Sequence, residues 1–288
     1  MKTNIEKLVK ISVQGSVNHP KLRFPGHRVG HDGIGRTVPA VAGITYTQFI
    51  GDSCIGLVGD HVEPGVSSKN PNPDDNAAYN TLACVGNEAI VISGDAKGRK
   101  GLVTGKHGGA DHVMLAFDAE TLDLLTCNDQ FLVKGFGLGL ALSDYPDVHT
   151  MNLSPDLLEK WGIVENGDGT LNVPVAAIVP AYLMGSGLGS TTSFSGDYDI
   201  MMHDANKVKE FNLDELRFGD LVYIQDHKSM FGPDYLEGAS TIGVIVHSDS
   251  FSSGHGPGVC VLLTSDRPIL KPVLSKTANL KDIYHFNK

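Results

Sequence analysis

The chain has 288 residues, of which 41% are hydrophobic and 19% charged; this composition is that of a globular protein and excludes a disordered one. Its 23 basic and 33 acidic residues give a net charge of −10, which argues against nucleic acid or an anionic membrane as a main partner, because either needs a basic face. The N-terminal stretch lacks the apolar core of a signal peptide, no apolar run approaches about 18 residues, and the four cysteines form no CxxC pair. We therefore expect a cytoplasmic protein with reduced thiols.

Short runs of β type recur along the chain, and long helical periodicity is nearly absent. Glycine, aspartate, asparagine and proline, the residues that turns require, bound these runs. In chain order the runs are KLVKISV, EAIVIS, GLVTG, HVMLAF, QFLVKGF, LNVPVAAIV, DLVYI, STIGVIV and GVCVLLT. The sequence therefore predicts a mainly β fold, with short-stranded barrel-like or sandwich-like domains and few short helices.

One helix is well signalled near residues 154–161. Ser154 can cap it, Pro155 and Asp156 suit its first turn, and Gly162 can close it. A second short helix is expected around LDELRFGD. The turn-rich VENGDGT that follows the first helix begins a new unit. This pattern predicts an N-terminal β domain over residues 1–150 and a C-terminal β-rich domain over residues 151–288.

The segment NEAIVISGDAKGRKGLVTGKHGGADHVMLAFD in the first half joins three strands by Gly-rich turns. It is similar to the small β-barrel motif of some ribosomal and transcription proteins. One interpretation is RNA contact through Lys97, Arg99, Lys100 and Lys106. The other is a solvated hairpin whose glycines supply positive φ angles, and the acidic balance of the chain favours it.

Two polar loops each follow an apolar strand that begins with an Ile-Gly pair, in IGLVGDHVEPG and IGVIVHSDSFSSGHGPG. Their ionisable side chains are Asp60, His61, Glu63, His247, Asp249 and His255. Since β scaffolds assemble sites from loops beyond strand ends, we predict that the loops meet and that His61 and His247 lie within about 15 Å of each other. Histidine and carboxylate together suit both a divalent metal ion and proton transfer.

The candidate catalytic residues are therefore His61, Glu63, His247, Asp249 and His255. His247 or His61 would act as the base, and Asp249 or Glu63 would orient it. Asp60, His61 and His247 are candidate ligands of a divalent metal ion, although no HExxH spacing supports them and a structural histidine is the alternative at His61. The amides of Gly254, Gly256 and Gly258 are candidate donors to a developing anion.

Three further stretches carry ionisable groups: GKHGGADH with Lys106, His107, Asp111 and His112; FSGDYDIMMHD with Asp197, Asp199, His203 and Asp204; and YIQDHKSMFG with Asp226 and His227. If the second stretch is a strand, Asp197 and Asp199 share a face and either bind a cation or have divergent pKa values; a solvated turn is the alternative. The glycines of MGSGLGS lack the GxGxxG spacing of a dinucleotide site, which leaves a backbone nest for an anion open.

Taken in order, GDHVEPGVS, GNEAIVISGDAKGRKGLVTGKHGG, MGSGLG, GDYDI, LRFGDLVYI and IGVIVHSDSFSSGHGPGV resemble the bacterial and archaeal family of domain of unknown function 4438. The resemblance implies a β-rich cytosolic protein and assigns no catalytic residues.

From the loops we expect an enzyme that acts on a small polar metabolite, by metal-assisted hydrolysis or by His/Asp acid–base chemistry of a lyase or isomerase. The alternative is a non-catalytic small-molecule-binding or assembly protein with structural histidines. Several apolar strands carry few alternating polar positions, so we also expect a homo-oligomer.

Overall fold

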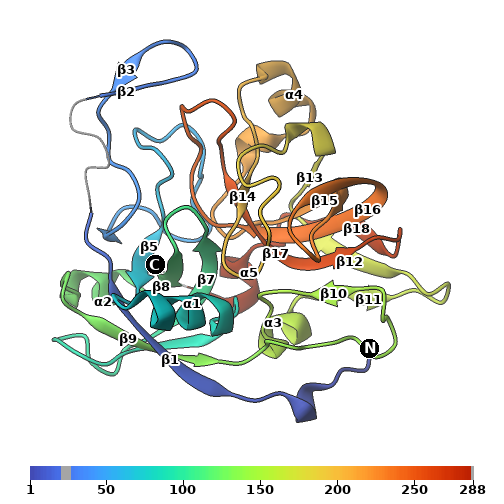
Figure 1. Ribbon diagram of the computed structural model, residues 1–288, viewed down its shortest axis with the longest axis horizontal. Helices are drawn as coiled ribbons and strands as arrows, with labels where there is room; N and C mark the ends of the chain where they lie inside the picture. The colour runs from blue at the N-terminus through green and yellow to red at the C-terminus, as the bar shows by residue number, and fades with distance from the viewer. Residues whose placement is uncertain (21–26, 287–288) are drawn as a thin grey trace.

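The protein is described here from a computed structural model that covers residues 1–20 and 27–286. Six strands of the N-terminal half form a closed barrel in the order β1-β9-β6-β7-β8-β5, and pairing of β1 with β5 completes the circle (Figure 1). The strands are β1 Ile11–Val17, β5 Gly65–Lys69, β6 Glu88–Val91, β7 Lys100–His107, β8 His112–Ala116 and β9 Gln130–Gly135. The short strand β4 (Ile44–Thr45) pairs with the outer side of β5. The fold is mainly β, as the sequence predicts.

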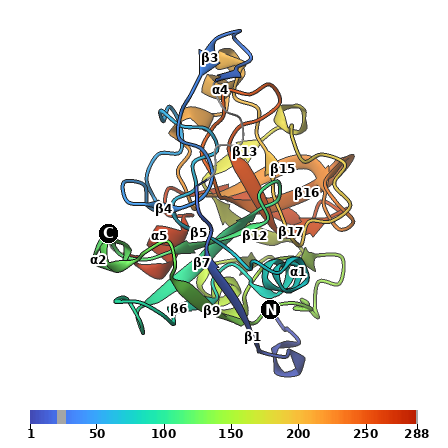
Figure 2. The same ribbon diagram turned by 60° about the vertical axis from the view of Figure 1, so that its left-hand side comes forward.

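A six-stranded open sheet from the C-terminal half packs beside the barrel, as Figure 2 shows from a second direction. Its strands are β10 His149–Thr150, β13 Ala177–Val179, β14 Tyr198–Asp199, β15 Leu221–Lys228, β16 Asp234–Ile245 and β17 Gly258–Ser265. A three-stranded sheet lies next to it, with β11 Val164–Glu165, β12 Leu171–Val175 and β18 Leu270–Leu274, and the hairpin β2 Arg28–Val29 with β3 Gly35–Arg36 projects from the body (Figure 1).

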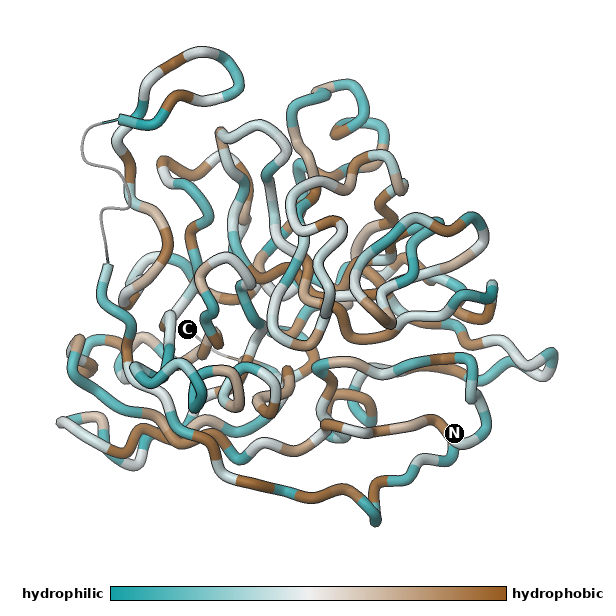
Figure 3. Tube along the Cα trace, viewed as in Figure 1, coloured by the Kyte–Doolittle hydropathy of each residue, from teal (hydrophilic) through white to brown (hydrophobic). Residues whose placement is uncertain are grey.

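Several strands are apolar on both faces because each face packs against a different core. In β8, Val113 and Leu115 fill the barrel, whereas Met114 contributes to the layer between barrel and sheet. In β17, Leu262 enters the same layer, whereas Val261 faces the far side of the sheet. Alternate side chains of a strand point to opposite faces, so this arrangement requires a continuous apolar run. The hydrophobic stretches of these strands accordingly cross the middle of the molecule (Figure 3). We expected a homo-oligomer because these apolar strand faces have to be buried, but packing within one chain already buries them. The oligomeric state stays a prediction.

Helices are short and lie around the sheets. They are α1 Pro73–Leu82, α2 Ala119–Leu124, α3 Pro155–Lys160, α4 Ala205–Glu210 and α5 Leu280–Tyr284, with 3-10 turns η1 Ile5–Lys7, η2 Ala181–Leu183 and η3 Leu213–Glu215. Helix α3 begins after the Ser154 cap as predicted, and the second predicted helix is reduced to the single turn η3. No described helix, in residues 1–20 or 27–286, is long and apolar enough to span a bilayer.

The longest helix, α1, was not predicted, because its sequence has no apolar stripe. It is fixed by its Asn72 cap and by Tyr79, a fully buried side chain whose hydroxyl bonds with Ser68 Oγ at 2.8 Å. Gly15 of β1 makes room for this ring, since a Cβ there would lie 2.6 Å from Tyr79 Cε1. Tertiary packing, rather than helical periodicity, holds this element.

Three of the basic residues singled out in the β6–β7–β8 segment have partners within the chain. Lys106 is fully buried, and its Nζ donates to Asn152 Oδ1 at 2.6 Å and to the Phe194 carbonyl at 2.7 Å. Lys100 pairs with Glu88, and Arg99 pairs with Glu120. Lys106 is therefore unavailable for RNA contact, and the choice between the two interpretations of this segment stays a prediction.

Candidate metal centre

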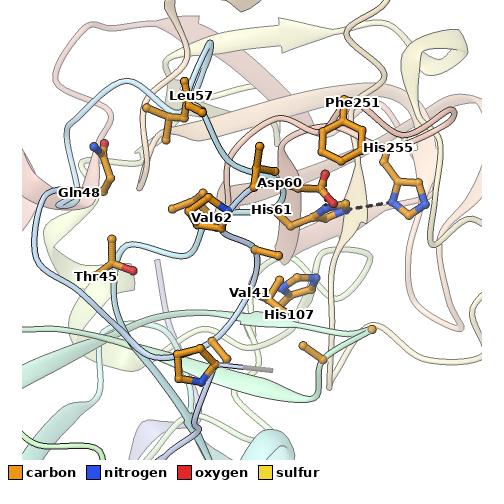
Figure 4. Close-up of a pocket in the computed structure, with 18 of the residues that line it drawn as sticks. Val41, Thr45, Gln48, Leu57, Asp60, His61, Val62, His107, Phe251 and His255 are labelled. Atoms are coloured by element: carbon orange, nitrogen blue, oxygen red, sulfur yellow. Dashed lines mark hydrogen bonds and ion pairs between the residues drawn. The ribbon is translucent and has the colours of Figure 1, made fainter. Parts of the chain in front are cut away.

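The two polar loops converge at the junction of the barrel and the second sheet, as predicted. The ring centroids of His61 and His247 lie 4.8 Å apart. Two contacts fasten the loops: the Val62 amide donates to Ser248 Oγ at 2.9 Å, and the His61 amide donates to the Asp249 carbonyl at 3.3 Å. His255 joins them, with its Nδ1 3.0 Å from His61 Nε2 (Figure 4).

Three further residues enter this cluster at or beside strands. None of them was among the candidate catalytic or metal-binding residues, although the sequence analysis noted Asp197 and Asp199 as a pair that either binds a cation or has divergent pKa values. His107 ends β7, and its ring centroid is 4.4 Å from that of His247. Asp197 and Asp199 lie at and beside β14, with carboxylate oxygens 2.8 and 3.6 Å from His247 Nε2. The alternation of Asp197 and Asp199 was the available signal. It became informative only once β14 paired with β17 beside His247.

Three imidazoles of the cluster share one hydrogen-bonding pattern: each directs Nδ1 to an oxygen acceptor. His61 Nδ1 lies 3.1 Å from Asp60 Oδ1, His107 Nδ1 lies 2.5 Å from Glu63 Oε1, and His247 Nδ1 lies 2.9 Å from the Ser248 carbonyl. Carboxylate and carbonyl oxygens accept, so Nδ1 carries the proton and Nε2 of the neutral ring presents a lone pair. Metal-binding histidines are held by this same kind of outer hydrogen bond.

The lone pair of His247 Nε2 faces a carboxylate instead of a donor. His247 Nε2 and Asp197 Oδ2 are 2.8 Å apart and buried, yet neither has a hydrogen-bond partner of acceptable geometry in the described part of the chain. Two acceptors this close repel each other unless a proton or a cation lies between them. A proton on His247 Nε2, which makes the contact an ion pair, or a metal ion in the place of that proton explains the short separation.

The spacing of these atoms suits a metal ion. One ligand atom from each of His61, Asp199 and His247 lies within 4.8 Å of the others, and the same holds for His107, Asp197 and His247. Two ligands of a tetrahedral ion, each about 2.0–2.1 Å from it, lie roughly 3.3 Å apart. The separations of 2.8 and 3.6 Å around His247 bracket that value. The two sets share His247, so an ion beside its Nε2 would complete its coordination from one set or from the other.

The charges of the cluster stabilise one another. Burial raises the pKa of Asp199, but hydrogen bonds from His247, His255 and His61 outweigh it and hold that pKa well below its ordinary value. Burial lowers the pKa of His247, but Asp197 and Asp199 outweigh it and place that pKa well above the ordinary range. The site thus favours carboxylate anions facing a positive charge, which a bound metal ion also provides.

A second buried group, formed by Glu63, His107 and His112, lies behind the first. Glu63 accepts from Ser67 and from His107, and its Oε2 lies 2.9 Å from His112 Nδ1. The other nitrogen of His112 accepts from Asn18 Nδ2 at 2.6 Å. Glu63 thereby orients His107 and not His61 or His247, which corrects the role expected from the sequence.

Asp249 also differs from expectation. Its Oδ2 accepts from the Gly56 amide at 2.9 Å, and the Ser248 carbonyl orients His247 in its place. Asp60 contacts His61 although the two are neighbours in the chain, because His61 has a left-handed φ of 54° instead of extended backbone. Asp249 therefore stabilises the loop and lies outside the ligand set.

The glycine-rich loops serve close packing more than anion binding. A Cβ on Gly256 would lie 1.7 Å from the Ile200 carbonyl oxygen, and the Gly256 amide points at Asp199 Oδ2, 3.4 Å away. In MGSGLGS, the amides of Gly185 and Ser186 donate to backbone carbonyls. These amides are therefore not available to a developing anion. His203 and His227 also lie elsewhere: His203 stacks on His31, and His227 stacks on Tyr198.

A cavity of about 820 Å³ opens onto the cluster. The cluster side chains that line it are Asp60, His61, His107, Asp197, Asp199 and His255. His255 is the most accessible of the histidines in the cluster, with 30% of its side chain exposed, whereas the side chain of His247 is fully buried. The arrangement thus has a buried side that suits an ion and an open side that a substrate can reach.

Comparison with known proteins agrees with the sequence resemblance. The model of the DUF4438 N-terminal domain, a domain of unknown function, matches residues 27–159, and that of the C-terminal domain matches residues 160–284. The chain belongs to the DUF4438 family. The two models meet between residues 159 and 160, whereas the sequence pattern placed a boundary near residue 150.

A crystal structure of a protein called TM1086 is similar to this member of the DUF4438 family. The two share 47% identity and a TM-score of 0.93, and the match covers 98% of each chain. None of the curated proteins matches the chain. The fold is thus that of a solved relative, and the function has to be argued from the site.

Proposed function

We propose that this DUF4438 protein is a metal-dependent hydrolase. The metal ion would be held by His247 Nε2 together with His61 and Asp199, or together with His107 and Asp197. One observation carries the proposal: three imidazoles have Nδ1 fixed on oxygen acceptors, and the remaining nitrogen of His247 faces the unpartnered Asp197 Oδ2. Imidazole with carboxylate favours Zn²⁺, Fe²⁺ or Mn²⁺ over Ca²⁺ or Mg²⁺.

When bound, such an ion lowers the pKa of water and polarises a carbonyl group, which is the chemistry that hydrolysis needs. The protein side chains supply the proton transfers. His255 lies at the open side, with Nδ1 3.0 Å from Asp199 Oδ2, so Asp199 orients it and leaves Nε2 as the basic nitrogen. His255 is therefore the proposed general base, in the manner of a carboxylate–histidine pair.

The reaction that fits is hydrolysis at a carbonyl carbon. Water adds its oxygen to that carbon and its proton passes to His255. The bond to the leaving nitrogen or oxygen then breaks, and His255 returns the proton to the leaving group. The products are a carboxylic acid and an amine or alcohol. The sequence has no GxSxG motif, so no serine nucleophile of that class competes with this scheme.

The first test is metal content. Protein freed of metal with a chelator is titrated with Zn²⁺, Mn²⁺, Fe²⁺ or Co²⁺, and bound metal is measured by elemental analysis, with Co²⁺ absorption as a second readout. We expect about one ion per chain. Binding of less than roughly a tenth of an ion per chain with every metal would show that the proposal is wrong.

The second test separates hydrolysis from simple binding. His255→Gln keeps the ring position polar but removes the basic nitrogen, so metal content should be retained while turnover of amides and esters falls by about 10²–10⁴. Metal-loaded protein that retains substrates of this class without converting them would instead favour a non-catalytic binding protein.

A further inference from the structure

The cavity in front of the proposed metal centre is walled by apolar side chains rather than polar ones. This apolar wall consists of Val38, Val41, Ile44, Leu57, Val58 and Val62. Figure 4 shows Leu57 and Val62 in the cavity together with His61 and His255. Val58 is 86% exposed, and the others are half-buried. Such a concave apolar surface beside a few convergent polar groups is the usual composition of a small-molecule site.

The apolar wall is built into the fold, although it lies almost entirely outside regular strands. Backbone bonds pin it to neighbouring loops and strands: the Asp60 amide donates to the Pro39 carbonyl at 2.9 Å, and the Ser67 amide to the Gly43 carbonyl at 3.0 Å. Ala42, between them, has a left-handed φ of 89°, a conformation that an alanine keeps only when its surroundings fix it. The wall is therefore present before any ligand binds.

The charges that line the cavity are already matched. Arg36 binds Asp32 through two Nη–carboxylate contacts, the longer being 2.8 Å, and Arg28 lies 3.4 Å from Asp60. The remaining ionisable groups gather at the metal end. A polyanionic ligand, such as a nucleotide, would place its phosphates against the apolar wall or against these paired guanidinium groups, at a desolvation cost.

We infer that the substrate is an amide or ester with an apolar body, an alkyl or aryl group, that lies against the apolar wall while its carbonyl group faces His255. This inference rests on the proposed function and narrows its amides and esters to those with a hydrophobic acyl or leaving group, in place of the small polar metabolite expected from the sequence. The cavity volume of about 820 Å³ falls in the range of ligand pockets and is large enough for such a molecule.

The test uses a series of ligands with one metal-binding head and a growing tail. Acetohydroxamate, butanohydroxamate, hexanohydroxamate and octanohydroxamate are titrated calorimetrically into Zn²⁺-loaded protein. Each methylene that leaves water strengthens binding by up to about fourfold, so we expect octanohydroxamate to bind at least roughly thirtyfold more tightly than acetohydroxamate. Acetamide, hexanamide and octanamide, which need no metal, are titrated into metal-free protein in parallel.

Two matched variants locate the effect. Val58→Asp places a charge on the apolar wall, and Val164→Asp places the same charge on β11 at another exposed valine. Val58→Asp should lower the affinity for octanohydroxamate at least about tenfold and the affinity for acetohydroxamate less than about twofold. Val164→Asp should change neither affinity. Circular dichroism and melting of both variants check that they fold.

The possible failures are distinguishable. The inference of an apolar substrate is wrong if hydroxamates bind but their affinity does not increase with tail length, or if Val58→Asp leaves that increase unchanged. In both cases the proposal of a metal centre is unaffected. If no hydroxamate binds, the metal proposal fails. The amides then test separately whether the cavity binds alkyl chains: equal affinity for acetamide and octanamide overturns the inference of an apolar substrate.

Discussion

Two buried clusters in this protein offer possible metal ligands, and they differ in whether their polar atoms are satisfied. In the inner group of Glu63, His107 and His112, the carboxylate oxygens accept from neighbouring donors, and both nitrogens of His112 are bonded. In the outer group around His247, which also contains His61, His107, Asp197 and Asp199, His247 Nε2 and Asp197 Oδ2 lie 2.8 Å apart, so a proton or a cation has to lie between them. The residue types are alike, so composition alone does not distinguish the two.

The difference teaches that a metal site is recognised by buried ligand atoms that lack hydrogen-bond partners, and not by residue types alone. A satisfied network of carboxylate and imidazole is a support, because binding a cation there would break existing hydrogen bonds. An unsatisfied group gains a partner when the cation binds. His107 belongs to both clusters: Nδ1 is bonded in the inner one, and Nε2 remains for the outer one. The group of Glu63, His107 and His112 therefore supports the metal centre from behind: its hydrogen bonds hold His107 in place without binding the ion.

The largest loss of bound metal is expected from His247→Ala. His247 is common to both ligand sets of the outer group, so its loss should reduce metal content from about one ion per chain to less than a tenth. Elemental analysis after gel filtration measures this. His149→Ala, at an exposed histidine on β10, is the matched control and should keep its metal. Full metal content in His247→Ala would break the comparison between the two clusters.

A smaller effect is expected from Glu63→Gln, which keeps the shape of the side chain and removes its charge. Outer-shell partners of metal-binding histidines typically contribute 10–100-fold, so metal affinity should fall by about that factor without disappearing. Competition with a chromophoric chelator gives the affinity. If Glu63→Gln abolished binding while His247→Ala did not, the inner group would be the metal site and our assignment would be inverted.

Gly258→Ala tests how closely the backbone packs against the outer group. A Cβ there would lie 1.9 Å from Asp197 Oδ2 and 2.3 Å from His247 Nε2, so both side chains have to move. We expect a loss of unfolding free energy of about 1–3 kcal/mol in denaturant melts, together with a severalfold weaker metal affinity. Gly167→Ala is the control, because nothing lies within 4 Å of its Cβ position. Equal stability of the two variants would contradict this packing.

Lys106→Met is expected to leave metal binding unchanged. Lys106 precedes His107, but its side chain points to Asn152 and Phe194, between the barrel and the second sheet. Removing the Lys106 ammonium group leaves Asn152 Oδ1 and the Phe194 carbonyl without this hydrogen-bond donor, which should lower the unfolding free energy by about 1–3 kcal/mol. Urea melts and metal titration of the same samples separate the two readouts. A change in metal affinity comparable to that of Glu63→Gln would place Lys106 in the outer shell as well.

The sequence by itself determined the class of fold and the neighbourhood of the site. Turn residues around short apolar runs identify β7, β8, β16 and β17, because strand period and turn chemistry are local properties. Ser154 and Pro155 likewise identify α3. An abrupt change from apolar to ionisable residues after the two Ile-Gly pairs located His61, His247 and His255, since such a change is visible without knowledge of the partners. The strand predicted at the first pair was wrong: residues 55–58 form a loop, whereas Ile242 and Gly243 lie in β16.

Only the tertiary structure decided which ionisable residues belong together and what each does. Asp249 was a better candidate than Asp199 on spacing, yet pairing of β14 with β17 brings Asp199 to His247, while the loop turns Asp249 toward Gly56. His107 enters the centre because the barrel and the second sheet pack against each other, which no local pattern encodes. The direction of a side chain depends on register, on single φ angles such as that of His61, and on long-range packing, and these are set by the whole fold.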